Sequence, residues 1–312
     1  MTPDGRESPK AGPAPDISVV IPHYDDLVRL AVCAAALAPQ ADDRIEVVVA
    51  DNGTPGGVGD ALAPLPRARV ITVDDRGAAP ARTAGAAATT APVIAFLDAD
   101  CRPLPDWIAA IRAAVAGHGM DRGRAVVLGG KIGVYDEAAA DPEAEGRGGG
   151  RTGSQAFETV FAFDQDGYVN RKGFAVTANL VVPRPVWDAT GPFRPGLSED
   201  VDWCQRAVRG GARLVYAPEI AVEHPTRSDW AALTKKWRRL TDEEYGLWGR
   251  DRPLRWRAKA LAMPASVIAH IPRMLLTPGL TPAEKGRGIA TLARLRLARM
   301  GWMLGQGGKD RK

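Results

Sequence analysis

The fold is decided by the stretch Val93-Ile94-Ala95-Phe96-Leu97-Asp98-Ala99-Asp100, in which five apolar residues lead directly into a pair of carboxylates. A short and wholly apolar run of this kind predicts a strand that is buried on both faces of a sheet. Similar runs lie before and after it in the chain, and four of them are expected to be strands: Ile17–Ile21, Ile45–Ala50, Val70–Val73 and Ala125–Gly129.

Segments with helical composition and spaced apolar positions alternate with the expected strands: Leu27–Leu37, Ala78–Thr89 and Asp106–Ala116. Strands that alternate with helices indicate βαβ units and a mostly parallel sheet with helices on both faces. The expected fold class is therefore α/β and Rossmann-like. Ligands of such sheets bind at the carboxyl ends of the strands.

The composition limits the class of protein. The chain has 312 residues and is 45% hydrophobic, which allows a large buried core. Its three cysteines, Cys33, Cys101 and Cys204, are scattered, so we expect reduced thiols rather than disulfides. Residues 1–15 are rich in Pro and Gly and lack an apolar segment, which predicts a disordered N-terminal segment and no secretory signal peptide.

The charge is distributed unevenly along the chain. Residues 227–312 contain 19 basic and 7 acidic side chains, a balance of +12, whereas residues 1–226 contain 22 basic and 30 acidic ones, a balance of −8. We therefore expect a domain at 16–226 followed by a separate basic and helical region at 227–312. A basic region of this kind contacts anionic lipid, nucleic acid or an acidic substrate, or is a solvated face.

Polar residues follow several of the expected strands at the same edge of the sheet. Asp98 and Asp100 can hold Mg²⁺ or Mn²⁺, which in turn binds a diphosphate. Asp51-Asn52-Gly53-Thr54 and Pro22-His23-Tyr24 end two other strands, and Tyr24 can stack on a nucleobase. Each of these motifs also fits an ordinary polar turn, which is the alternative interpretation.

Three further candidates lie elsewhere in the chain. Ser198-Glu199-Asp200 precedes an apolar helix, where the residues either complement the helix dipole or provide a carboxylate that deprotonates an acceptor hydroxyl. His224 follows an apolar strand and is a candidate metal ligand or an ordinary surface residue. Arg82 is a candidate phosphate ligand or a solvated charge.

Taken together and in their order along the chain, these motifs resemble the family 2 glycosyltransferases. The resemblance runs from about Ile17 to His224 and rests on the following stretches: Val19-Val20-Ile21-Pro22-His23-Tyr24, Asp51-Asn52-Gly53-Thr54, Ala81-Arg82-Thr83-Ala84-Gly85, Phe96-Leu97-Asp98-Ala99-Asp100, Thr177-Ala178-Asn179 through Arg184, Gly191-Pro192-Phe193 and Ser198-Glu199-Asp200-Val201-Asp202. It implies the GT-A fold, a nucleotide-sugar-binding sheet. It also implies transfer of a sugar from a nucleoside-diphosphate sugar with inversion of the anomeric centre.

The resemblance also implies roles for the residues that would bind the donor. Pro22 and Tyr24 belong to the first-strand motif, and Tyr24 and Asp51 would contact the nucleobase. Arg82 would contact the base or the diphosphate, and Asp98 would reach the ribose side of the nucleotide.

Metal binding and catalysis follow from the same resemblance. Asp100 would ligate the metal most directly, with Asp98 and His224 as further ligands. Asp200 would be the catalytic base, and Glu199 would orient the acceptor.

The sequence departs from the family pattern at several places. Thr83 stands where many members have Asn, and Thr177 stands where Gly is usual. Asp202 lies two residues beyond Asp200 and leaves the identity of the base open. The Gln-x-x-Arg-Trp signature of processive synthases is absent, and Lys235-Lys236-Trp237-Arg238-Arg239 does not replace it, so we expect a single-addition enzyme.

The basic C-terminal region contains two segments of interest. The uncharged stretch between Lys259 and Arg273 is too short to cross a membrane. Ala283–Leu304 is expected to be an amphipathic helix that lies in the membrane interface, with its apolar face formed by Ile289, Leu292, Leu297, Met300, Met303 and Leu304. The alternative is that these helices pack against the core or a second subunit. We expect a cytoplasmic protein, peripheral to the inner face of the cell membrane.

The sequence thus predicts an inverting glycosyltransferase that acts on a glycan or lipid-linked acceptor. A metal-dependent nucleotidyltransferase is the first alternative, although no Gly-rich loop containing Lys lies near the first strand. A non-enzymatic nucleic-acid-binding module is the second. Nucleic acid is not an expected partner, because the domain at 16–226 is rich in acidic residues.

Overall fold

The computed structural model describes residues 13–137, 150–195 and 198–309. These residues form two compact units. The first, unit 1, comprises residues 13–131, 165–195 and 199–222, and the second, unit 2, comprises the remainder. The expected disordered segment, 1–15, lies almost wholly outside the described residues. The chain passes from unit 1 into unit 2 for the last time between residues 222 and 223, four residues before the boundary predicted between 226 and 227.

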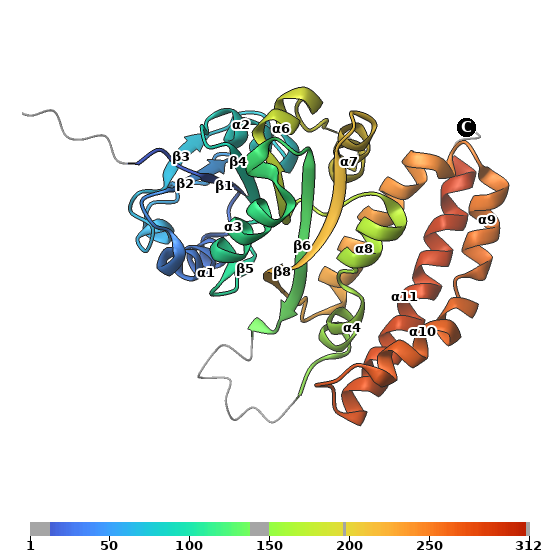
Figure 1. Cartoon of the computed structure of the whole chain (residues 1–312). Helices are drawn as coiled ribbons and strands as arrows, with labels where there is room; N and C mark the ends of the chain where they lie inside the picture. Colours follow the sequence, from blue (N-terminus) through green and yellow to red (C-terminus); the bar gives the residue numbers. More distant parts are fainter. Residues whose placement is uncertain (1–12, 138–149, 196–197, 310–312) are drawn as a thin grey trace, which may run out of the picture. The chain divides into compact units, whose positions relative to one another are not determined.

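Four parallel strands form one side of the sheet: β1 (Ile17–His23), β2 (Ile45–Asp51), β3 (Arg69–Thr72) and β4 (Val93–Leu97). β1 lies between β2 and β4, with Ile17 opposite Ile45 on one side and Val93 on the other. In this register Asp51 lies beside His23, so the ends of the two strands meet at one edge (Figure 1). Four of the five expected strands are present here, and the fifth, Ala125–Gly129, lies in the other part of the sheet.

The rest of the sheet is not uniformly parallel. Four more strands complete it: β5 (Arg102–Pro103), β6 (Val126–Tyr135), β7 (Asn179–Pro183) and β8 (Arg213–Pro225). The order across the sheet is β3-β2-β1-β4-β7-β6-β8-β5. β7 runs antiparallel to both β4 and β6, so the sheet is mixed. An apolar run shows that a strand is buried but contains no information about its direction.

Helices cover both faces of the sheet in unit 1. All five residues of β4 are buried, and successive residues of a strand point to opposite faces. The helices of this unit are α1 (Leu27–Leu37), α2 (Ala78–Ala87), α3 (Trp107–His118), α6 (Arg184–Thr190) and α7 (Glu199–Arg209). Shorter helical segments lie at Ala38–Gln40, Asp60–Leu62, Met120–Arg122, Gln165–Gly167 and Tyr168–Lys172.

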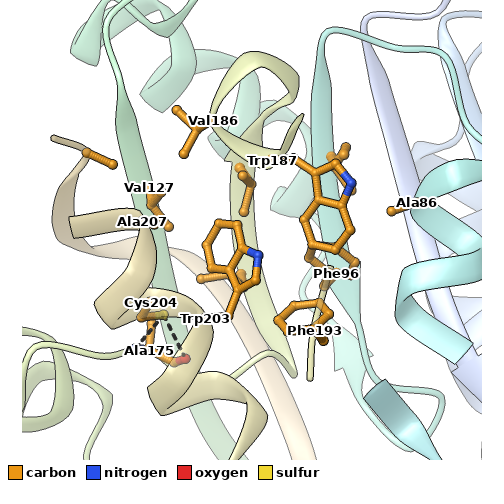
Figure 2. Packing of buried hydrophobic residues seen from close by; sticks show 14 of the residues in the cluster. Ala86, Phe96, Val127, Ala175, Val186, Trp187, Phe193, Trp203, Cys204 and Ala207 are labelled. Carbon is orange, nitrogen blue, oxygen red and sulfur yellow. Dashed lines mark hydrogen bonds between the residues drawn. The ribbon is translucent and has the colours of Figure 1, made fainter. Parts of the chain in front are cut away.

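A cluster of aromatic side chains fixes α6 and α7 against the sheet (Figure 2). Phe96 of β4 contacts Trp187 of α6 and Phe193, each at 5.3 Å between ring centroids. Trp203 of α7 stacks on Trp187 at 5.7 Å, and its indole N–H donates to the carbonyl of Gly191 at 2.9 Å. These contacts hold the start of α7 near the strands whose ends form the sheet edge.

Unit 2 contains the C-terminal helices, as the sequence predicted. They are α4 (Gly153–Phe161), α8 (Trp230–Glu244), the π-helical turn Tyr245–Gly249, α9 (Pro253–Ala262), α10 (Ala265–Leu276) and α11 (Pro282–Lys309). Leu292 and Leu295 of α11 are fully buried with Phe157 of α4 and Leu233 of α8. Met303 of α11 is buried against α9.

The predicted apolar face of Ala283–Leu304 requires a correction. Leu292 and Met303 are buried inside unit 2, whereas Leu297 and Leu304 are exposed. On a helix of 3.6 residues per turn the two exposed leucines lie nearly opposite the buried stripe, which contains Leu295 in their place. The apolar face of α11 is therefore part of the core of unit 2 and is not open to a membrane.

Candidate active site

A cavity of about 410 Å³ lies at the carboxyl ends of β1, β2 and β4 in unit 1. Five of the residues selected from the sequence line it: Pro22, Tyr24, Arg82, Asp98 and Asp100. The strands end side by side because they are parallel neighbours, so motifs that are far apart in the sequence meet at one edge. Asn52 and Arg76 also line the cavity, and neither was assigned a role from the sequence.

Tyr24 forms an exposed aromatic surface at one end of the cavity. Its side chain is 48% exposed, and the Arg76 guanidinium lies 5.3 Å from the ring centroid. Arg76 also donates a hydrogen bond of 3.2 Å to the tyrosine hydroxyl. A planar cation beside an aromatic ring is suited to stacking on a nucleobase. An exposed arginine in a loop has no distinctive sequence signal, which is why it was missed.

Asn52 fixes the loop that carries Arg76. Its side-chain amide donates to the carbonyls of Val73 and Asp75 at 3.1 and 2.9 Å, and its oxygen accepts from the N–H of Gly77 at 3.3 Å. Gly77 has φ = 121°, a conformation that disfavours residues with a Cβ, and α2 begins immediately after it. The loop therefore enters α2 in one defined direction.

Asp51 organises the turn after β2. Its Oδ1 accepts from the Thr54 hydroxyl at 2.5 Å and from His23 Nδ1 at 2.9 Å, and its Oδ2 accepts from the N–H groups of Gly53 and Thr54. Burial acts to raise the pKa of Asp51, but these hydrogen bonds hold it below its ordinary value. Because the N–H of Asp26 donates to His23 Nε2, Nδ1 carries the proton directed at Asp51. The predicted contact of Asp51 with the nucleobase stays a prediction.

Arg82 connects the end of β4 to the start of α7. The side chain is 5% exposed, and its two terminal nitrogens donate to Asp98 Oδ1 at 2.5 Å and to Glu199 Oε1 at 3.0 Å. Burial acts to lower the pKa of Arg82, but the charges of Asp98, Asp200 and Glu199 raise it above its ordinary value, so the guanidinium is charged. Among the described residues, no hydrogen-bond partner lies within reach of its buried Nε.

Gly85 allows α2 to approach the sheet closely enough for Arg82 to make these contacts. A Cβ at this position would lie 2.4 Å from Cγ1 of Val20 on β1. A larger residue would therefore push α2 away from the sheet.

The acidic residues at the start of α7 have different environments. Burial, followed by the negative charge of Glu199, raises the pKa of Asp200 to about 6, although Arg82 opposes the shift. Asp202 instead forms ion pairs with Arg206 at 2.8 Å and with Arg194 at 3.6 Å. The Arg206 guanidinium also donates to the carbonyls of Thr190 and Pro192, at the end of α6 and just beyond it. Asp202 is thus part of the contacts that join α7 to α6.

Asp98 and Asp100 both line the cavity and provide the hard oxygen atoms that Mg²⁺ and Mn²⁺ prefer. Among the described residues, no group of three or more His, Cys, Asp or Glu side chains is arranged to hold a metal ion. The two carboxylates therefore fit a site whose coordination is completed by phosphate oxygens and water. His224 belongs to unit 2, where its ring packs 5.2 Å from Phe163 and its Nδ1 donates to the carbonyl of Pro225. Its contact with a metal stays a prediction.

The cysteines near this site are not reactive. Cys33, Cys101 and Cys204 are free and buried, as the sequence predicted. Burial raises the pKa of Cys33 and of Cys101, and the nearby charges of Asp100 and Asp98 raise both further. These thiols stay protonated and are not candidate nucleophiles.

Comparison with known proteins shows similarity to glycosyltransferases. Residues 18–168 match the model of Glycosyl transferase family 2. The glycosyltransferase AglE of Haloferax volcanii is 28% identical over 80% of this chain and 79% of its own. The pre-mycofactocin glycosyltransferase of Mycobacterium tuberculosis is 27% identical over 72% of this chain, and this chain spans 46% of its length. The validoxylamine A glucosyltransferase of Streptomyces hygroscopicus is 35% identical over 41% of this chain and 31% of its own.

A solved structure is also similar. The mannosyltransferase PcManGT from Pyrobaculum calidifontis, in complex with GDP-Man and Mn²⁺, matches with a TM-score of 0.48 and 15% sequence identity. The match covers 96% of this chain and 76% of that one.

The fold and the site define a nucleotide-sugar-dependent glycosyltransferase with a GT-A domain, as the sequence predicted. The segment at residues 18–168 belongs to glycosyl transferase family 2. The two alternatives, a nucleotidyltransferase and a nucleic-acid-binding module, are set aside by this assignment.

Proposed function

We propose that this glycosyltransferase performs a single displacement with inversion of the anomeric centre, and that Asp200 is the general base. The acceptor oxygen forms a bond to the anomeric carbon while the bond from that carbon to the diphosphate oxygen breaks. The electron pair of the broken bond leaves with the nucleoside diphosphate, and the hydroxyl proton goes to Asp200. The observation that supports this role is the partly buried position of Asp200 at the start of α7, beside Glu199, with a pKa of about 6, since a base is most effective when its pKa lies near the working pH.

Glu199 and Arg82 would assist the catalytic base, Asp200, by orienting the acceptor and by contacting the donor. Glu199 is held by Arg82 and would orient the acceptor hydroxyl. Arg82 would contact the diphosphate or the nucleobase of the donor. Because Arg82 also pairs with Asp98 and Glu199, a contact with the donor would affect the residue that orients the acceptor. Both functions agree with the position of Arg82 on the cavity wall.

The donor would lie along the cavity, with its base at Tyr24 and its phosphates near Asp100. Pro22, Tyr24 and Arg76 would bind the base, and Asp51 would hold the turn after β2 or reach the base itself. Asp98 would contact the ribose side. This arrangement follows the order of the lining residues from β1 to β4.

Asp100 and Asp98 would hold Mg²⁺ or Mn²⁺, and His224 is the further ligand that the family resemblance predicts. A bound divalent cation neutralises the charge that accumulates on the leaving diphosphate. The protein's own contribution is to place two carboxylates at the cavity wall and to keep one of them, Asp98, oriented through Arg82.

We also propose that the acceptor is a glycan or a lipid-linked glycan and that the protein works at the inner face of the cell membrane. The support is the excess of basic residues in 227–312. Within the described residues, no helix has the length and the apolar character needed to cross a bilayer.

A screen of nucleotide sugars tests this function. Hydrolysis of a panel of nucleoside-diphosphate sugars with Mn²⁺ should release nucleoside diphosphate from one donor. Proton NMR of the glycosylated product should show the anomeric configuration opposite to that of the donor. A product that retains the configuration would contradict the single displacement.

A further inference from the structure

An exposed apolar stripe lies on the outer side of α9 and α10 in unit 2. Five large side chains form it, with exposed fractions of 80% for Leu254, 65% for Leu261, 74% for Ile268, 50% for Leu275 and 82% for Leu276. Most soluble surfaces carry single exposed apolar residues, but a continuous series of large ones marks an interaction surface.

The spacing places these residues on one side of the two helices. Leu254 and Leu261 of α9 are seven residues apart, as are Ile268 and Leu275 of α10. Seven residues correspond to nearly two turns, so each pair lies within about 20° on its helix. Ala265, Ala269 and Pro272, which share the face of Ile268, are exposed as well.

The opposite side of the same helices is buried, so the stripe is not simply a loosely packed part of the core. Trp256, Ala260 and Met263 pack with Met303 of α11, and Met274 of α10 is fully buried with Ala156 of α4. Trp256 further donates from its indole N–H to the carbonyl of Met303 at 3.1 Å. Both helices thus pack on α11 with one side, and their other side is exposed to solvent (Figure 1).

Basic side chains border the stripe. Between residues 250 and 276 the sequence contains six Lys or Arg and one acidic residue, Asp251. Arg255 and Arg257 are exposed and lie on either side of Leu254 and Leu261 by helical position. Among the described residues, Arg252, Arg255 and Arg257 form no ion pair within the protein. An apolar stripe between unpaired cations matches a bilayer with anionic headgroups, into which apolar side chains insert while arginines contact phosphates.

We infer that this surface, Leu254, Leu261, Ile268, Leu275 and Leu276 with the bordering arginines 252, 255 and 257, docks the protein on anionic lipid bilayers. The inference rests on the proposed work at a membrane and identifies α9–α10, rather than α11, as the contact. A second copy of the chain is less suited to the surface, because it would bring the same cations face to face. Lying in the interface, the two helices would orient unit 2 toward an acceptor held in the bilayer.

Vesicle binding tests the surface without donor or acceptor. The full chain is sedimented with vesicles of phosphatidylcholine and phosphatidylglycerol, and with phosphatidylcholine alone. Leu261→Gln/Ile268→Gln should weaken binding to the anionic vesicles about tenfold or more. The matched control, Leu297→Gln/Leu304→Gln, changes two exposed leucines of α11 and should bind as the unaltered protein does.

The charge is tested in the same way. Arg252→Gln/Arg255→Gln/Arg257→Gln should weaken binding about 100-fold. Arg124→Gln/Arg209→Gln/Arg213→Gln removes the same charge from exposed positions of unit 1 and should have little effect. Circular dichroism and melting curves establish that each variant is folded.

The outcomes separate the possibilities. If the unaltered protein fails to bind anionic vesicles, membrane association itself is wrong, although glycosyl transfer to a soluble acceptor can still be measured. If it binds but the α9–α10 variants bind equally well, the surface is wrong. If the apolar variant converts a dimer to a monomer in sedimentation velocity without lipid, the surface binds a second copy and the inference is overturned.

Discussion

The Arg82 guanidinium donates a hydrogen bond of 2.5 Å to Oδ1 of Asp98, and both residues belong to the wall of one cavity. The bond joins a helix to the end of a strand, and the second terminal nitrogen of Arg82 reaches Glu199 at the start of α7. The arginine therefore holds residues proposed for the donor and for the acceptor in one arrangement.

Replacing Arg82 should affect both stability and activity. Arg82→Met removes the partner of two partly buried carboxylates, Asp98 and Glu199, which are 27% and 25% exposed. We expect a loss of about 2–3 kcal/mol of unfolding free energy, below the figure for a fully buried pair because water still reaches the acids. Arg82→Lys keeps the charge but not the two-pronged contact, so it should restore stability in part and kcat/KM very little. Urea unfolding and steady-state kinetics measure the two effects.

Asp200→Asn should reduce turnover by about 10²–10⁴-fold while leaving donor binding intact, because the amide cannot accept the hydroxyl proton. Asp202→Asn is the matched control. It weakens the ion pairs with Arg206 and Arg194, so we expect a lower melting temperature and a small change in kcat. An inactive Asp202→Asn variant beside an active Asp200→Asn variant would show that the base has been assigned to the wrong aspartate.

The activity should depend on pH through the same carboxyl. With a pKa of about 6 in the free enzyme, Asp200 is protonated below that pH, and log kcat/KM should fall with unit slope as the pH drops. A profile that stays flat down to about pH 4 would argue against this carboxyl as the base.

The contribution of Asp200 to stability should change with pH in the direction opposite to that of the activity. Its pKa of about 6 lies above the ordinary value of 3.8, so its favourable contribution is complete below about pH 4 and is lost as the pH rises through 6. Asp200→Asn should therefore melt at a higher temperature than the unaltered protein at pH 8. The difference should disappear near pH 4, and calorimetric scans across this range test it.

Asp100→Asn should abolish the metal-dependent part of donor binding and leave the fold intact. Asp100 is a cleaner test than Asp98, because changing Asp98 also removes a partner of Arg82. Asp106→Asn, at an exposed position before α3, is the control. Titration calorimetry with the cognate donor, with and without Mn²⁺, gives the readout, and an unchanged Mn²⁺-dependent affinity would rule out the role of Asp100.

Tyr24→Ala should raise the donor KM about 5- to 100-fold, since stacking of a base on an aromatic ring is worth about 1–3 kcal/mol. Tyr24→Phe keeps the ring and loses only the hydrogen bond from Arg76, so its KM should stay close to that of the unaltered protein. Equal KM values for the alanine variant and the unaltered protein would place the base elsewhere in the cavity.

The sequence by itself determined the elements and the edge at which the site lies. α1 occupies Leu27–Leu37, the range predicted from composition and apolar spacing, and β4 occupies the apolar run before Asp98. Apolar periodicity is a local property, so it defines the elements and their buried faces. The carboxyl-edge rule then placed Tyr24 and Asp98 together, because parallel neighbouring strands end on the same side.

Only the tertiary structure decided which of these residues contact each other and which faces remain open. Arg82 and Glu199 are 117 positions apart, and no local pattern connects them. Asp200 and Asp202 have the same side chain and are both partly buried. Only their neighbours, Glu199 for Asp200 and Arg206 for Asp202, make one a candidate base and the other an ion-pair partner. The amphipathic pattern of α11 indicated an apolar face but not what covers it. What covers the apolar face of α11 depends on which helices pack against it. In the structure α4, α8 and α9 bury this face, and the exposed apolar stripe lies on α9 and α10 instead.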